Sequence, residues 1–116
     1  MDLGNNGISN IEPLSGMSNL NELNLHQNDI EDLTSLMTLT KLRELSLYSN
    51  LLRDISPLSV LTSLETLILA YNIITDLRPL MKLPKLKMMQ LDENPLMEPD
   101  AELKEFLSKI KGPYDD

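Results

Sequence analysis

The chain has no cysteine, no tryptophan and a single phenylalanine among its 116 residues. Without cysteine, neither a disulfide framework nor a thiolate metal site can form. Aromatic residues make up 3% of the sequence and hydrophobic residues 41%, so a folded core must be mainly aliphatic. The four glycines form no phosphate-binding loop. Disulfide-stapled, thiolate-metal and phosphate-loop proteins are therefore excluded.

Basic residues are also scarce. Ten Lys and Arg stand against eighteen Asp and Glu, which gives a formal net charge of −8 at pH 7. Nucleic acids and anionic membranes select basic surfaces, so neither is expected as a partner. The sequence also has no signal-peptide pattern and no apolar stretch of membrane-spanning length. We expect an intracellular protein, cytoplasmic or nuclear, unless an N-terminal leader has been removed.

Leucine recurs with a strict period. One set lies at intervals of 22 residues: Leu3, Leu25, Leu47, Leu69 and Leu91. An asparagine follows each of them by three residues: Asn6, Asn28, Asn50, Asn72 and Asn94. Further apolar columns keep this register without insertion or deletion. The length accommodates one domain, and we predict five repeats over residues 1–97, the first of them incomplete.

The chemistry of one repeat predicts its local structure. Leu45 and Leu47 alternate as in a short strand with one buried face. The asparagine that follows can satisfy buried backbone groups at a turn, and stacked copies would form an asparagine ladder. An Asp or Asn with a proline three residues later, as in Asp54 and Pro57, is typical of a short helical or 3₁₀ turn. Each repeat is therefore a strand, a turn and a tight return.

The pattern LxxLxLxxNxIxDIxPLxxLxx resembles the 22-residue class of leucine-rich repeats. That class includes the regulatory subunit of type-one protein phosphatase and the bacterial internalins. The resemblance implies an α/β-repeat solenoid with a short parallel sheet on its concave side and 3₁₀ or short helical turns on its convex side. It does not imply one function, because members of the family bind many unrelated partners.

Residues 98–116 depart from the repeat and predict a C-terminal capping helix with a tail. Asp100 can N-cap a helix that begins at Ala101, and Gly112 is a natural stop. The apolar positions of this segment have helical spacing: Leu103, Phe106, Leu107 and Ile110. We expect this helix to seal the core of the last repeat.

The N-terminal end shows no such cap. Met1 already stands in the buried column of the first strand, which would leave that strand's edge open. Two explanations stay open: a preceding segment has been removed, or a second copy of the chain covers the edge.

The residues between the buried leucines should point outward from the sheet, and we call this surface the concave face. It contains five carboxylates and no Lys or Arg: Asp2, Glu22, Glu44, Asp92 and Glu93. The resulting negative field can steer a partner protein with a basic or mixed basic and apolar surface. The predicted binding residues are Glu22, Asn24, His26, Glu44, Ser46, Tyr48, Thr66, Ile68, Tyr71, Met88, Gln90 and Asp92.

Four of these residues are candidate anchors, because exposed aromatic and apolar side chains on a rigid sheet mark interfaces. We expect Tyr48, Ile68, Tyr71 and Met88 to lie close together. Each also has an ordinary explanation. The tyrosines can be cross-strand contacts, Ile68 can reflect β-propensity, and acidic residues such as Glu22 can serve solubility. Only their joint placement favours binding.

No catalytic or metal site is expected, and no cofactor. His26 is the single histidine, and no orienting carboxylate or set of metal ligands accompanies it. The sequence therefore predicts a non-catalytic interaction module, such as a regulatory or scaffold subunit. Two alternatives stay open: an internalin-like surface adhesin fragment, and a structural module that self-associates through its first strand.

Overall fold

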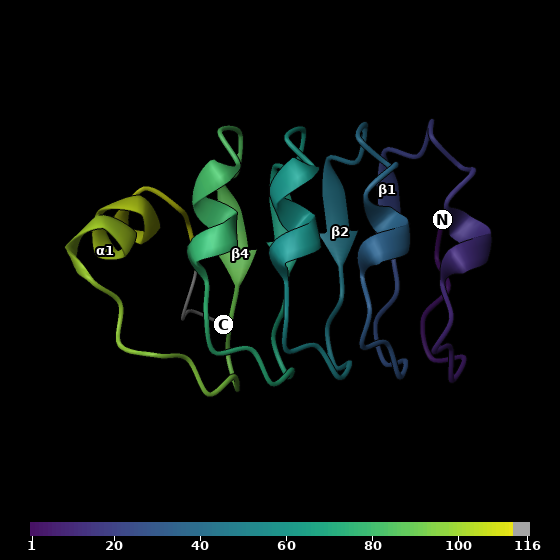
Figure 1. Ribbon diagram of the computed structural model, residues 1–116, viewed down its shortest axis with the longest axis horizontal. Coiled ribbons are helices and arrows are strands. Elements are labelled where there is room, and N and C mark those ends of the chain that lie inside the picture. The colour runs from purple at the N-terminus through teal and green to yellow at the C-terminus, as the bar shows by residue number, and fades with distance from the viewer. Residues whose placement is uncertain (113–116) are drawn as a thin grey trace.

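Strands of three residues, one per repeat, build the sheet of the computed structural model, which describes residues 1–112. The strands are β1 (Glu22–Asn24), β2 (Glu44–Ser46), β3 (Thr66–Ile68) and β4 (Met88–Gln90). They are parallel, lie in the order β1-β2-β3-β4, and pair each residue with the one 22 positions later, as in Glu22 with Glu44. Figure 1 shows them side by side, with the 3₁₀ turns stacked along one side of the sheet. The predicted leucine-rich-repeat solenoid is confirmed.

The return segments are 3₁₀ helices: η1 (Glu12–Leu14), η2 (Thr34–Leu36), η3 (Ser56–Val60) and η4 (Arg78–Lys82). The aspartates predicted to cap them lie one residue further upstream than an N-cap. Asp54 Oδ1, for example, accepts a hydrogen bond from the N–H of Ser56 at 2.9 Å. A short carboxylate reaches the amide two residues on without help from the rest of the fold. The turn is therefore set locally, by an Asx turn rather than by a standard cap.

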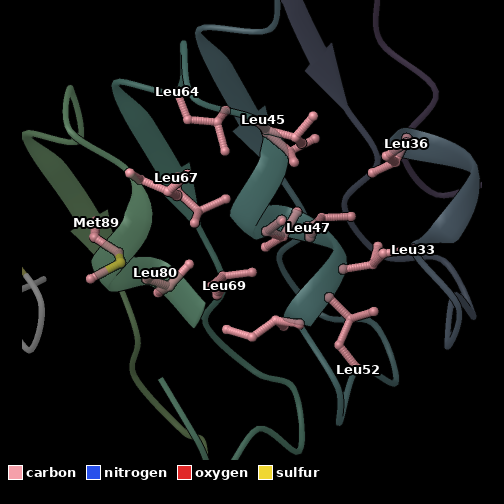
Figure 2. Packing of buried hydrophobic residues seen from close by; sticks show 14 of the residues in the cluster. Leu33, Leu36, Leu45, Leu47, Leu52, Leu64, Leu67, Leu69, Leu80 and Met89 are labelled. Atoms are coloured by element: carbon pink, nitrogen blue, oxygen red, sulfur yellow. The ribbon is translucent and has the colours of Figure 1, made fainter. Parts of the chain in front are cut away.

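The core lies between the sheet and these turns. Leu45, Leu47, Leu67 and Leu69 project from the strands toward the leucines of the 3₁₀ helices, as Figure 2 shows. All four are at most 1% exposed. Burial of a leucine side chain contributes about 1.5–3 kcal/mol, so the repeated leucine columns are the main source of stability.

An asparagine ladder runs along one side of this core. Asn50 Oδ1 accepts a hydrogen bond from the N–H of Ile30 at 3.1 Å, and its Nδ2 donates to the carbonyl oxygens of Leu25 and Leu47. Asn72 makes the equivalent bonds one repeat later. Both asparagines are buried, and their side chains satisfy backbone groups that the turn leaves without partners.

The C-terminal helix α1 (Ala101–Ser108) begins where the sequence predicts. Asp100 Oδ1 accepts from the N–H of Leu103 at 2.9 Å, and Leu107 is buried against the core. After the helix the chain returns to the sheet, and Lys111 forms a parallel bridge with Met88. The last strand is therefore paired with backbone at Lys111, and α1 packs against η4 of the same repeat. The predicted tail beyond residue 112 lies outside the described residues.

The N-terminal repeat is less complete. Asp2 forms an isolated parallel bridge with Asn24, in place of a full strand. The expectation that Met1 stands in a buried column holds for its register but is wrong for its side chain, which is 47% exposed. Leu3 and Ile8 are also only partly buried. The reason is geometric, since each repeat buries its apolar columns between two neighbours and the described residues supply only one here.

Candidate interaction face

The strand register arranges the outward residues in rows across the sheet. The predicted residues at strand starts and ends occupy two rows: Glu22, Glu44, Thr66 and Met88, then Asn24, Ser46, Ile68 and Gln90. Just beyond the strands, 22-residue steps place His26, Tyr48 and Asp92 in a third row. Tyr71 lies one position further on, in the turn. The structure thus brings the predicted residues to one face, although their role in binding stays a prediction.

The N-terminal half of the concave face is hollow and acidic. A depression of about 260 Å³ is lined by residues that include Asp2, Glu22, Glu44, Ser46, Thr66 and Ile68. Glu22 and Glu44 are direct cross-strand neighbours, an arrangement that like charges disfavour. Among residues 1–112, no Lys or Arg forms an ion pair with any carboxylate of this face. Within the described part of the chain, the carboxylates of this face therefore have no ion-pair partner.

Charges at the edge where the strands begin are compensated instead. Glu65 pairs with Lys87 at 2.9 Å and with Arg43 at 3.6 Å. The hydrogen bond from Lys87, together with the charges of Lys87 and Arg43, lowers the pKa of the Glu65 carboxyl. Residues 1–40 contain six Asp and Glu and no Lys or Arg at all. Among the described residues, the carboxylates of the concave face and of residues 1–40 therefore form no ion pair, in contrast to Glu65.

The predicted aromatic cluster is present as a pair. The rings of Tyr48 and Tyr71 have centroids 5.3 Å apart and planes tilted by 58°. Tyr71 is 51% exposed, and Met88 is also exposed. Ala70, which follows Tyr48 by 22 residues and shares its row, is only 4% exposed. Beyond the strands the chain already turns, so strict alternation no longer applies there.

A repeated left-handed turn carries the outermost column of the face. Its members all have positive φ, between 53° and 61°: Asn5, Gln27, Ser49, Tyr71 and Glu93. Every repeat imposes this conformation, which non-glycine residues adopt at a cost. The sequence analysis placed Tyr71 and Glu93 on the face but missed the left-handed conformation, because the column contains no glycine to indicate it.

His26 is held in place by its neighbours. Its Nδ1 donates to Asn24 Oδ1 at 2.5 Å, and its ring lies where a side chain on Gly4 would otherwise stand. Within residues 1–112, no group of three His, Cys, Asp or Glu side chains could hold a metal ion. No described helix is long and apolar enough to cross a membrane. The roles of Gly4 and Asn24 could not be read from the sequence, since neither belongs to a repeated motif.

The sequence of the chain matches a family model. The model of leucine-rich repeats in two copies matches residues 1–36 and 18–60, which together cover just over half of the chain. The chain belongs to the leucine-rich-repeat family. No curated protein sequence gives a significant match.

Solved structures of bacterial leucine-rich-repeat proteins are similar to this chain. The internalin InlF of Listeria monocytogenes is 31% identical with a TM-score of 0.84, and the match covers 94% of this chain and 32% of InlF. Internalin C2 of the same organism is 38% identical with a TM-score of 0.82, over 84% of this chain and 43% of its own. A leucine-rich-repeat protein of Leptospira interrogans is 27% identical with a TM-score of 0.85, over 98% and 30%. The chain thus spans less than half the length of each.

Proposed function

We propose that this chain is a non-catalytic module that binds another protein through its concave face, in a regulatory or scaffold role. The observation that carries the proposal is the set of five carboxylates without internal ion pairs on a sheet that also presents an aromatic pair. Leucine-rich-repeat proteins generally act as interaction modules, which supports the absence of a catalytic role. The partner surface that fits is basic, or basic and apolar.

Affinity capture with matched variants tests this proposal. Glu22→Gln with Glu44→Gln removes two charges from the concave face, and Glu12→Gln with Glu31→Gln removes two exposed charges elsewhere. We expect the first pair to slow association with a captured partner, most clearly at low salt, and the second pair to change it little. Equal behaviour of both pairs would contradict the role of the concave face.

Substitution of the anchors gives a second readout. Tyr48→Ala, Ile68→Ala and Tyr71→Ala together remove the apolar part of the concave face. We expect capture to be lost while the circular dichroism spectrum is retained. Capture that persists through the triple substitution would place the binding surface elsewhere.

An internalin-like surface fragment is the second candidate, and the 31% and 38% identities to two internalins favour it. An intracellular location is the proposal that we prefer, on the sequence features described above. Protease treatment of intact source cells separates the two, because a surface fragment is cleaved and an intracellular protein is protected. Light scattering over a concentration series tests the further alternative, self-association through the exposed edge at Asp2.

A further inference from the structure

The C-terminal half of the concave face combines an exposed aromatic ring with free carboxylates. Tyr71 and Glu93 occupy the same turn position in successive repeats, so their backbones are neighbours about 4.8 Å apart. Asp92 precedes Glu93, and its carbonyl oxygen accepts the N–H of Tyr71 at 2.8 Å. Neither carboxylate is in an ion pair within residues 1–112.

The Asp92 side chain has an unmet hydrogen-bonding requirement. Its Oδ1 atom is buried and has no hydrogen-bond partner among the described residues. Buried polar atoms are almost always paired, and an unpaired acceptor costs stability. Among residues 1–112 no donor pairs with this oxygen. A cationic donor from a partner would satisfy both the hydrogen bond and the charge of the Asp92 carboxylate.

Tyr71 is an unfavourable residue for its position. A bulky side chain at φ 61° is conformationally costly, and the residue is still 51% exposed, so burial does little to offset that cost. Smaller polar residues, Asn5 and Ser49, occupy the same position in other repeats. Packing against Tyr48 fixes the ring, and part of its surface stays open to solvent. An exposed aromatic ring held in place by a neighbouring ring can attract a cation.

We propose that Tyr48, Tyr71, Asp92 and Glu93 form a subsite for one basic side chain of the partner protein, with arginine as the preferred residue. The guanidinium group stacks on the Tyr71 ring, and its planar N–H donors reach the carboxylates beside it. Lysine presents a point charge without this planar face and binds less well. The subsite rests on the proposed function, since it names the group that the concave face grips.

Titration with defined peptides tests the subsite. The probes are three short glycine- and serine-rich peptides that differ only at a central arginine, lysine or citrulline, the last being a neutral isostere of arginine. Backbone amide shifts of isotopically labelled protein report both affinity and location. We expect affinity in the order arginine, lysine, citrulline, with the largest shifts around Tyr71 and Glu93.

Two substitutions of Tyr71 distinguish the effect of its aromatic ring from the effect of any apolar side chain at this position. Tyr71→Phe keeps the aromatic face and should bind the arginine peptide like the native protein. Tyr71→Leu removes that face and should weaken binding about two- to fivefold, the range that an exposed cation–π contact supplies. Thermal denaturation of both variants verifies that each is folded.

The outcomes also separate this subsite from the proposed function. Equal binding of arginine and citrulline peptides, no binding of the arginine peptide, or native affinity in Tyr71→Leu would each overturn the subsite. The subsite tests can fail while the Glu22→Gln and Glu44→Gln pair still reduces capture of the partner. The concave face would then remain the proposed binding surface, but the arginine subsite would not be part of it. Weaker binding of the arginine peptide by Tyr71→Leu, together with native affinity in Tyr71→Phe, supports the subsite.

Discussion

Asn50 and Leu25 are joined by a hydrogen bond of 3.0 Å from the asparagine Nδ2 to the leucine carbonyl oxygen, across 25 residues of chain. The same Nδ2 donates to Leu47 within its own repeat, and Oδ1 accepts from Ile30. One side chain therefore connects a turn to the backbone of the preceding repeat. No residue of different shape offers both an acceptor and two donors in this geometry.

Replacement of Asn50 by alanine should destabilise the fold by about 2–4 kcal/mol, because buried backbone groups of Leu25, Ile30 and Leu47 lose their partner. Urea denaturation measures the change. Asn6→Ala is the control, since the Asn6 side chain bonds only within its own exposed turn and its loss should cost less than about 1 kcal/mol. The bond from the Asn6 N–H to Asn28 Oδ1 is kept in this variant. Equal costs at both positions would show that the ladder is not the source of the effect.

Gly4→Ala should displace the His26 ring. A Cβ atom on Gly4 would overlap that ring, and moving the ring breaks its hydrogen bond to Asn24. We expect a loss of about 1 kcal/mol and a shift of the histidine ring resonances in NMR spectra. Gly16→Ala is the matched control, because a Cβ atom there meets open space. A histidine spectrum unchanged by Gly4→Ala would contradict this packing.

Asp100→Ala should cost about 1 kcal/mol, the usual value of a side-chain N-cap, because α1 loses the acceptor for the Leu103 N–H. The same carboxylate pairs with Arg78 at 3.2 Å, but both side chains are largely exposed. Arg78→Ala should therefore change stability by less than about 0.5 kcal/mol. Thermal denaturation of the two variants distinguishes the cap from the ion pair, and similar losses would assign the effect to the pair.

Acid should remove the stabilisation that the Glu65 carboxylate gives to the folded protein. Its folded-state pKa lies below the ordinary value of 4.5, because Lys87 donates a hydrogen bond to it and Lys87 and Arg43 carry positive charge. The stabilisation is present above that ordinary value and disappears as the pH falls through the lowered pKa. The difference in melting temperature between the native protein and Glu65→Gln should therefore exist at pH 7 and disappear as the pH falls through the lowered pKa of Glu65. A difference that persists in acid would assign it to packing.

Much of the fold follows from the periodicity. A leucine that recurs every 22 residues has one parallel register available, and the strands obey it from Glu22 to Gln90. The bridge between Lys111 and Met88 could not be predicted, because residues after α1 occur once and match no column. The same limit applies to Glu65, whose neighbours in its column change from repeat to repeat.

The candidate site was predictable as a surface but not in its contacts. Position in the repeat places Tyr48 and Tyr71 in adjacent turns, and the rings do meet. The burial of Ala70 and the unpaired Asp92 Oδ1 atom depend on how individual side chains fill the turn. A pattern of apolar and polar letters carries no information of that kind.

The order β1-β2-β3-β4 also determines how the chain folds and how it unfolds locally. Each strand touches only its predecessor and its successor, so folding closes loops of one repeat at a time and resembles a one-dimensional chain of coupled units. An interior unit opens only when a neighbour does, whereas the first repeat opens alone. Amide protons near Leu3 should therefore exchange with solvent fastest and those of Leu47 and Leu69 slowest. The backbone pairing of Lys111 with β4 should slow exchange at Met89.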